Sequence, residues 1–147
     1  MNDISAYINS AILKLPFNLF NIISEYIELN SKVKVAIVGG YIRDLLITKF
    51  NKKIFFKPLD IDIVTEGSSV DLAKFIKKNI SNVEFCLIKE FKIYNTVELN
   101  INNLKIDIAS ARKENYEAPG LNPIVKHSNI EEDLKRRDFS INAIAFE

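Results

Sequence analysis

The sequence contains little cysteine and little histidine, and each scarcity excludes a class of site. Its 147 residues include one cysteine, Cys86, so it has neither an intramolecular disulfide nor a metal site built from several cysteines. We expect Cys86 to be a core thiol on a strand. The single histidine, His127, has no second histidine or cysteine placed to share a metal ion, and we expect it at the surface.

Long apolar runs are also missing. A membrane-spanning helix needs 18 or more apolar residues, whereas the run at 35–42 is bounded by Lys34 and Arg43. The N-terminus lacks the basic start and apolar segment of an export signal, and Lys14 and Pro16 interrupt it. We therefore expect no membrane association and a cytoplasmic protein. Abundant Ile, Asn and Lys suggest an AT-rich genome, which extends this expectation to an organellar stroma or matrix.

Charge of one sign is not in excess. The 20 Lys and Arg residues against 19 Asp and Glu residues give a formal net charge of +1. There is no general basic field to attract nucleic acid, so any RNA contact must come from a local patch or a partner chain. Hydrophobic residues at 48% and charged residues at 27% are typical of one folded domain, which at this length buries roughly 68–70% of its unfolded surface.

Hydrophobic periodicity predicts an α+β fold. Up to residue 79 we expect two helices within 1–30 separated at Pro16, a strand at 33–38, a helix at 41–47, a loop at 48–58, a strand at 59–65 and a helix at 67–79. The last helix should turn Val70, Ala73, Phe75 and Ile76 inward.

Beyond residue 79 the expected elements are three strands at 83–89, 92–101 and 104–109, a loop carrying Arg112, and helices at 129–136 and 139–146. Asn102 and Asn103 predict a tight hairpin between the last two strands. Helices and strands alternate first and a strand meander follows, so we expect a mixed β-sheet flanked by helices.

Asp60 and Asp62 stand two residues apart in the strand predicted at 59–65. Side chains alternate between faces along a strand, so both carboxylates point the same way, about 7 Å apart at their Cα atoms, while Leu59, Ile61 and Ile63 enter the core. Neighbouring carboxylates repel unless a cation lies between them. Hard oxygen ligands of this kind suit Mg²⁺, which completes its shell with substrate phosphates and water. The alternative is an exposed acidic strand face.

Asp107 lies with Lys105 on the polar face of the strand predicted at 104–109. If this strand neighbours 59–65, Asp107 completes a carboxylate triad able to hold two metal ions about 3.5–4 Å apart. The alternatives are an exposed residue, or one that is paired with Arg112.

Gly39 and Gly40 separate the strand predicted at 33–38 from the following helix. Glycines at a strand-to-helix turn let phosphate oxygens approach backbone N–H groups, and the helix dipole favours the negative charge. Arg43 lies in the first turn, where its guanidinium reaches the same phosphates, and Asp44 either holds Arg43 or caps the helix. A glycine pair is also typical of an ordinary turn.

Arg136, Arg137, Asp138 and Asn142 form a third group near the C-terminus. Two guanidinium groups can hold a triphosphate, and a carboxylate can accept a hydrogen bond from the ribose hydroxyl that distinguishes RNA from DNA precursors. The alternative is a solvated helix end whose charges pair along the helix.

Taken in this order, the three groups resemble the head domain of class II tRNA nucleotidyltransferases, the CCA-adding enzymes, and bacterial poly(A) polymerases, within the DNA polymerase β-like superfamily. The matching segments are VGGYIRDLL (38–46), LDIDIVTEG (59–67), KIDIASARKENYEAPGLNP (105–123) and IEEDLKRRDFSINAIA (130–145). The resemblance implies a DNA polymerase β-like nucleotidyltransferase head at 33–147, preceded by an N-terminal helical extension at 1–32.

The resemblance also implies a reaction and its cofactor. Asp60 and Asp62 match metal-binding carboxylates, which implies Mg²⁺, and Gly40 and Arg43 match nucleotide-binding positions, with Gly39 beside them. The implied reaction is attack of an RNA 3′-hydroxyl, most simply that of a tRNA, on the α-phosphate of ATP or CTP with release of pyrophosphate. Such enzymes act mainly by positioning and charge neutralisation.

Within the third group, Arg137 matches a further nucleotide-binding arginine, and Asp138 belongs to the segment associated with ribose recognition. Arg136 and Asn142 lie in the same motif and are taken as nucleotide-binding.

The sequence departs from the family pattern in one segment. The stretch between Arg43 and Asp60 is longer than usual and carries Phe55, Phe56 and several lysines.

The neck, body and tail domains that select the base and hold tRNA in the family are expected to be absent from this chain. Either the chain is a fragment of a longer protein, or a second chain supplies the neck and body. Two other functions stay open: RNA 3′ polyadenylation on the same head, and a non-catalytic head-like subunit in RNA processing. Retention of Asp60 and Asp62 favours catalysis.

Overall fold

The structure is a computed structural model that describes residues 2–51, 60–115, 117–118, 120, 123–138 and 140–146. Its first segment forms two helices, α1 (Asn2–Ile12) and α2 (Leu19–Leu29), with a short 3₁₀ turn, η1 (Pro16–Asn18), between them. Phe17 and Asn18 adopt positive φ values of 61° and 57°, which interrupt the helical path. The predicted break at Pro16 is therefore confirmed.

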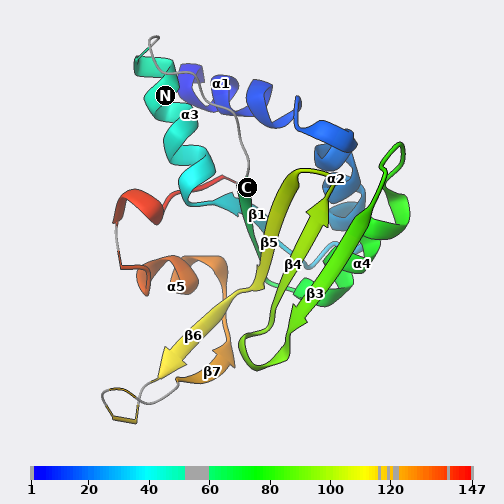
Figure 1. The fold of residues 1–147 in the computed structure, drawn as a ribbon. Helices are drawn as coiled ribbons and strands as arrows, with labels where there is room; N and C mark the ends of the chain where they lie inside the picture. Colours follow the sequence, from blue (N-terminus) through cyan, green and yellow to red (C-terminus); the bar gives the residue numbers. More distant parts are fainter. Residues whose placement is uncertain are drawn as a thin grey trace.

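A six-stranded sheet forms the centre of the molecule, in the order β3-β4-β5-β2-β1-β8 (Figure 1). The strands are β1 (Val35–Val38), β2 (Asp60–Thr65), β3 (Cys86–Phe91), β4 (Thr96–Ile101), β5 (Leu104–Ser110) and β8 (Ala145–Phe146). β2 and β5 are parallel, whereas the other neighbouring pairs are antiparallel. The predicted mixed sheet and α+β class are confirmed.

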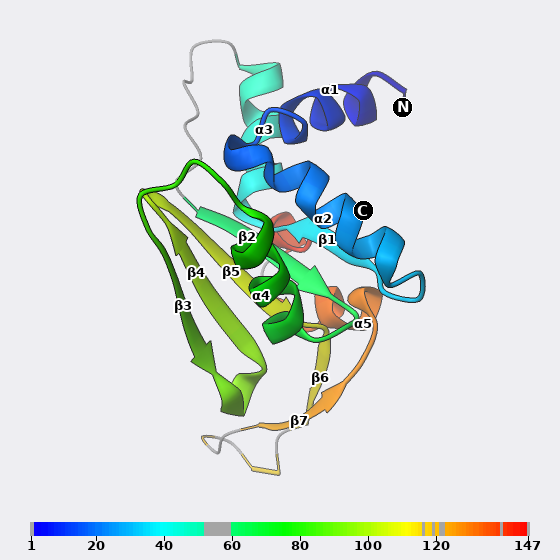
Figure 2. The same cartoon turned by 90° about the vertical axis from the view of Figure 1, so that its right-hand side faces the viewer.

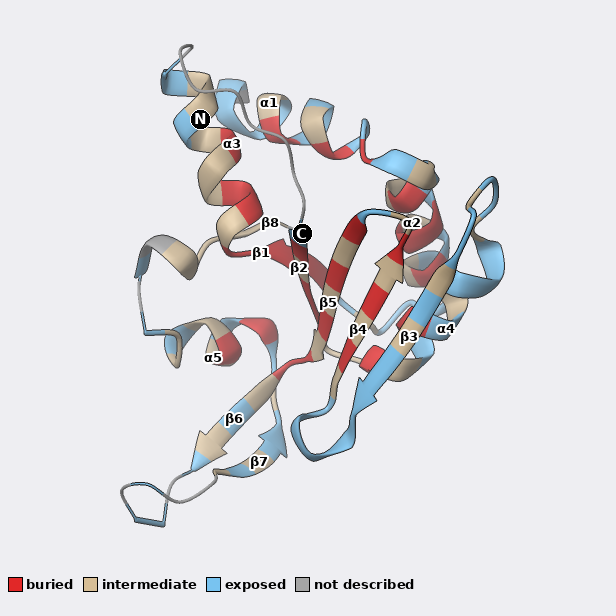
Figure 3. Cartoon of the chain, viewed as in Figure 1, coloured by how far each residue is buried: buried red, intermediate tan, exposed pale blue. Residues whose placement is uncertain are grey.

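Helices cover one face of this sheet. α4 (Ser69–Asn79) and α2 lie behind β3, β4 and β5 in Figure 1, and the rings of Tyr26 and Phe75 join the two helices at a centroid distance of 5.3 Å. Alternate residues of β4 and β5 are buried toward the helices, as the banding in Figure 3 shows. Ile106 and Ile108, both fully buried, each contribute roughly 1.5–3 kcal/mol by this burial.

The N-terminal helices share this core. Ile8 and Ile12 of α1 and Leu19 of α2 belong to the same apolar cluster as the buried residues of the sheet. The boundary between an extension at 1–32 and a head at 33–147 stays a prediction.

Two helices follow glycine or serine turns. α3 (Gly40–Phe50) begins one residue earlier and ends three residues later than expected. Residues 52–59 lie outside the described residues, and they include the first residue of the strand predicted at 59–65. Ser68 caps α4 by accepting a hydrogen bond from the Asp71 amide. Of the predicted inward set in α4, Ala73 and Ile76 are buried, Val70 and Phe75 are half-buried, and the prediction missed Leu72.

The strand predicted at 92–101 is shorter in the structure. Residues 92–94 form a 3₁₀ turn, η2 (Lys92–Tyr94), because Asn95 adopts a left-handed conformation with φ 49° that interrupts the extended chain. The predicted hairpin at Asn102 is confirmed, with φ 51° at Asn102 and Ile101 opposite Leu104. Cys86 is half-buried and packs against the core, so the expected core thiol lies at its margin.

The segment after β5 was predicted as a loop, and this prediction is wrong. It forms a hairpin of β6 (Arg112–Asn115) and β7 (Ile124–His127), which projects from the end of the molecule opposite α1 (Figure 2). His127 is exposed, as expected.

The predicted helix at 129–136 is confirmed as α5 (Ile130–Lys135), whereas the helix predicted at 139–146 is wrong. That segment forms a 3₁₀ turn, η3 (Ser140–Asn142), and then β8, which pairs with β1. The pairing satisfies the outer edge of β1, which a helix would leave without partners.

Among the described helices, none has the length and apolar character needed to cross a membrane.

Candidate active site

Asp60 and Asp62 lie on the sheet face opposite the helices. Both project from β2, where Ile61 and Ile63 between and after them are each 1% exposed and enter the core. Asp60 is exposed and Asp62 is half-buried. The alternation predicted from the sequence therefore sets the two carboxylates side by side on a rigid strand.

Asp107 lies on the neighbouring strand, directly opposite Asp62 in the parallel pairing of β2 with β5. Its carboxylate accepts a hydrogen bond from the Lys105 ammonium at 2.8 Å, and Lys105 also contacts Glu98 at 3.4 Å. Arg112, the alternative partner considered for Asp107, pairs instead with Glu114 at 2.7 Å.

These charges act on Asp62. Its pKa is raised above the ordinary value, first by burial and then by the negative charges of Asp107 and Asp60, while Arg137 and Lys105 oppose the rise. The face thus holds carboxylates whose mutual repulsion a cation would relieve.

Within the described ranges, no three Asp, Glu, His or Cys side chains are grouped closely enough to hold a metal ion. The proposed triad of Asp60, Asp62 and Asp107 is therefore not assembled as three ligands around one point. The donor set fits Mg²⁺ nevertheless, because this ion usually takes one or two carboxylates and keeps water or substrate phosphate in its other positions.

Gly39 forms the turn between β1 and α3 and lies against Asp62. Its φ of +73° is one that side chains rarely adopt, and a Cβ atom added there would lie 3.2 Å from Asp62 Oδ2 and 3.8 Å from Arg137 Nη1. The Gly39 amide donates to the Ile144 carbonyl at 3.0 Å. This hydrogen bond ties the turn to the segment before β8, and the expected contact of the turn with a phosphate stays a prediction. Because Gly39 has a hydrogen atom in place of a side chain, the Asp62 carboxylate can approach the turn closely.

Gly40 begins α3, and Arg43 follows in its first turn. Arg43 Nε donates to Asp44 Oδ1 at 2.6 Å, so Asp44 holds the arginine, one of its two predicted roles. Arg43 Nη1 donates to Asn142 Oδ1 at 2.8 Å, across 99 residues of sequence. The guanidinium thereby joins the start of α3 to η3, beside Gly40, whose added Cβ would lie 3.4 Å from Arg43 Nη2.

Asp133 organises the C-terminal arginines. It is completely buried and accepts hydrogen bonds from Arg136 Nη2 at 2.7 Å, from Arg137 Nη2 at 3.3 Å and from the Arg112 amide at 3.1 Å. Arg136 also donates to Glu114 at 3.0 Å. We had not predicted a role for Asp133, although its spacing of three and four residues from the two arginines was a usable signal.

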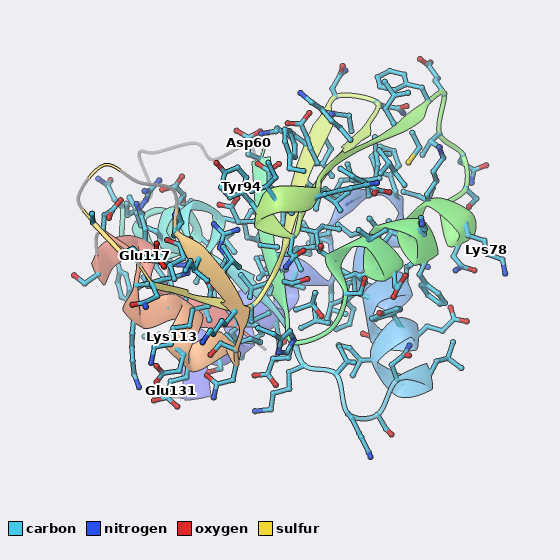
Figure 4. All side chains as sticks on the ribbon, turned by 90° about the horizontal axis from the view of Figure 1, so that it is seen from below. Asp60, Lys78, Tyr94, Lys113, Glu117 and Glu131 are labelled. Carbon is cyan, nitrogen blue, oxygen red and sulfur yellow. The ribbon has the colours of Figure 1, made fainter. Side chains whose placement is uncertain are left out.

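Two adjoining clefts open on this side of the sheet. The larger, of about 600 Å³, is lined by Asp62, Asp107 and Arg137 together with Phe91 and Tyr94. Figure 4 shows Asp60 at the edge of β2 and Tyr94 on η2, both on the side of the molecule away from Lys78.

The smaller cleft, of about 470 Å³, is lined by Arg136, Arg137, Asp138 and Asn142. Asp138 is exposed there. The structure thus brings the whole third group of predicted residues to one cleft, which shares Arg137 with the carboxylate cleft.

The site thus combines paired carboxylates on neighbouring strands of a mixed sheet with a glycine turn and clustered arginines. Residues 35–147 match the family described as the poly A polymerase head domain. The chain therefore belongs to the poly A polymerase head domain family.

Similar proteins include enzymes that act on tRNA. The chain is 39% identical over 114 residues to the A-adding tRNA nucleotidyltransferase of Aquifex aeolicus, covering 77% of this chain and 12% of that protein. A solved apo CCA-adding enzyme superposes with a TM-score of 0.70 at 35% identity, covering 92% of this chain and 31% of that one.

A tRNA nucleotidyltransferase solved with a primer tRNA and an incoming ATP analogue superposes with a TM-score of 0.59 at 30% identity, covering 82% of this chain and 29% of that one. The chain thus spans less than a third of the length of these similar proteins.

Proposed function

We propose that this protein is the catalytic head of an RNA nucleotidyltransferase, which adds nucleotides from ATP or CTP to the 3′ end of tRNA in CCA addition or repair. The observation that carries the proposal is the convergence of Asp62, Gly39 and Arg137 at one point, with only 3.2 Å between Asp62 Oδ2 and the position of a Gly39 Cβ. A carboxylate, a glycine turn and a guanidinium supply a cation site next to an anion site.

Asp60 and Asp62 would hold Mg²⁺, with Asp107 opposite Asp62 on the neighbouring strand β5. When bound, the ion supplies charge neutralisation between these carboxylates and the nucleotide phosphates. Removing the Asp62 negative charge should then remove the binding of Mg²⁺ and of the phosphates together.

Arg43 and Arg137 would hold the triphosphate. Their guanidinium groups are positioned by Asp44 and Asp133 respectively, and each lies within 4 Å of the space beside Gly39 or Gly40. Charge-assisted hydrogen bonds from such groups orient the phosphates so that the α-phosphate faces the acceptor hydroxyl. In the transfer, the acceptor oxygen bonds to the α-phosphorus, the bond to the β-phosphate oxygen breaks, pyrophosphate leaves and the hydroxyl proton passes to solvent.

Asp138 would accept a hydrogen bond from the ribose hydroxyl, and Asn142 would support it. Both line the smaller cleft together with Arg136. The Asn142 oxygen already accepts from Arg43, so its contribution to the ribose is a hydrogen bond donated by its NH₂ group. Arg136, which is held by Asp133 and Glu114, would add positive charge to this cleft.

Choice between ATP and CTP would lie outside this chain. The arginines and glycines described above would contact phosphates, which every nucleotide shares. The similar proteins include one named A-adding and one named CCA-adding, which fits a head common to enzymes of different base choice. A second chain with neck and body domains stays a prediction, and no observation favours polyadenylation over tRNA addition.

The test is incorporation of label from [α-³²P]ATP or [α-³²P]CTP into tRNA lacking its CCA end, with Mg²⁺. We expect wild-type protein to label the tRNA, Asp62→Asn to abolish labelling and Glu28→Gln, an exposed carboxylate on α2, to leave it unchanged. An Asp62→Asn variant as active as wild type, or a Glu28→Gln variant as inactive as Asp62→Asn, would reject the proposal.

A further inference from the structure

Phe91 and Tyr94 form one wall of the larger cleft, which we call the aromatic wall. Phe91 ends β3 and Tyr94 ends η2, and each is 38% exposed. Both line the cleft that contains Asp62 and Asp107. Partly open aromatic rings in a cleft offer a flat, apolar surface on which a planar group can stack.

Tyr94 is held in place without being buried. The carbonyl of the next residue, Asn95, accepts hydrogen bonds from the Ser110 amide at 3.0 Å and from Ser69 Oγ at 2.9 Å, which tie η2 to β5 and α4. The Arg112 guanidinium lies 5.6 Å from the centroid of the Tyr94 ring and donates to the Tyr94 carbonyl. The ring is therefore preorganised at the edge of the cleft.

The floor beside the wall is made of small residues. Phe91 is paired with Thr96 on β4, and Thr96 with Ala109 on β5. Both small residues line the cleft. Their short side chains leave room for a flat group to lie between the aromatic wall and the Arg137 side.

The wall and the Gly39 turn lie on opposite sides of the carboxylates. In the sheet order β3-β4-β5-β2-β1-β8, the Gly39 turn follows β1, the carboxylates lie on β2 and β5, and the wall belongs to β3 and to the turn before β4. Phosphoryl transfer requires the attacking and leaving oxygens to be roughly in line. If the triphosphate lies at the Gly39 turn, the acceptor strand enters from the side of the wall.

We infer that the aromatic wall is a stacking subsite for the 3′-terminal base of the RNA acceptor strand. The inference rests on the proposed function and adds to it the position of the acceptor. Basic groups accompany the rings, since Lys89 Nζ lies 4.8 Å from the Phe91 centroid and Lys92 begins η2. Rings interleaved with basic side chains are typical of single-stranded nucleic acid binding, and stacking accepts any base because each has a π face.

The test uses a short oligoribonucleotide with 2-aminopurine as its 3′-terminal base, whose fluorescence falls when the base stacks. Titration of the wild-type protein at about 0.05 M salt should quench this fluorescence. Tyr94→Ala should bind the oligonucleotide about 5- to 100-fold more weakly and remove the quenching. Tyr94→Phe, which keeps the ring, should behave as wild type.

Ile93→Ala is the matched control, because Ile93 is the preceding residue of η2, is 77% exposed and is not among the cleft-lining residues. It should leave affinity and quenching unchanged. An oligonucleotide that lacks its terminal base should bind wild type and Tyr94→Ala equally well.

In the RNA titrations, the inference is overturned by no quenching with wild-type protein, by an equal loss in Ile93→Ala, or by a loss in Tyr94→Ala that persists without the terminal base. Mg²⁺-dependent ATP binding is measured in the same variants without RNA. If Tyr94→Ala loses ATP affinity instead, the wall serves the incoming nucleotide and the inference is wrong. Failure of the proposed function would appear separately, as Asp62→Asn with unchanged ATP binding.

Discussion

Replacing Gly39 by alanine tests the geometry of the site directly. The substitution adds one methyl group at φ +73°, a conformation that costs on the order of 1–3 kcal/mol for a residue with a side chain. The added carbon would also lie 3.2 Å from Asp62 Oδ2, so the carboxylate must move by a few tenths of an ångström. Gly39→Ala should therefore lower both stability and nucleotide affinity.

For a domain of this size, 1–3 kcal/mol corresponds to a fall of roughly 2–12 °C in melting temperature. Urea denaturation gives the loss of unfolding free energy, and titration with ATP in Mg²⁺ gives the affinity, which should fall by about tenfold because a displaced ligand no longer meets the phosphates and cation correctly.

Gly120→Ala is the control for the backbone cost alone. Gly120 has a φ of +84°, but an added Cβ would meet no atom within 4 Å. It should lose stability while keeping wild-type ATP affinity. The reasoning fails if Gly39→Ala has wild-type stability, or if it binds ATP as tightly as Gly120→Ala does.

Four further results are expected. Folding raises the pKa of Asp62, so ionisation of Asp62 lowers the stability of the folded protein as pH rises above the unfolded value near 3.8. Without divalent cations, Asp62→Asn should therefore have a higher melting temperature than wild type at pH 7. This gain should shrink as pH falls toward 3.8. An unchanged difference between pH 7 and pH 4 would contradict this. Asp133→Asn removes the buried negative charge that pairs with Arg136 and Arg137, so it should lower the free energy of unfolding in urea by about 3–5 kcal/mol and weaken ATP binding. Wild-type stability of this variant would show that Asp133 does not hold Arg137. Asp138→Ala should reduce the preference for ATP over dATP roughly 10- to 100-fold, because a hydrogen bond to a charged group contributes about 1.5–3 kcal/mol. An ATP/dATP affinity ratio equal to that of wild type would show that Asp138 does not recognise the ribose. The wild-type chain should bind ATP and CTP with affinities that differ by less than about threefold, because its contacts are to phosphates, and a strong preference in competition titrations would reveal a base-reading element.

Much of the fold could be predicted because local patterns decide it. Alternation along 60–63 and 104–109 predicts which side chains are buried, and Asn102 predicts the hairpin between β4 and β5. The same alternation places Asp60 and Asp62 on one face, and the pairing of β2 with β5 then brings Asp107 opposite Asp62.

The missed elements depend on partners far along the chain. β8 forms because Ala145 and Phe146 pair with β1, which lies more than 100 residues earlier in the chain. The local sequence of 139–146 alone does not predict a strand. The β6–β7 hairpin likewise depends on contacts such as that between Arg112 and buried Asp133.

At the site, residue types were predictable but their contacts were not. The Gly39 amide donates to the Ile144 carbonyl because β8 lies beside the turn, a contact that the local sequence around Gly39 does not predict. Asp133 was missed because an acidic residue in a charged helix normally faces solvent, whereas here it is fully buried under two arginines.

The central claim is that the carboxylates of β2 bind a nucleotide together with a divalent cation. The most direct measurement is the ATP affinity of wild type, Asp62→Asn and Glu28→Gln, each titrated with Mg²⁺ and with EDTA. We predict that wild type and Glu28→Gln bind ATP at least about tenfold more tightly with Mg²⁺, and that Asp62→Asn loses this difference. An Asp62→Asn variant with the same Mg²⁺ dependence as wild type would contradict the account.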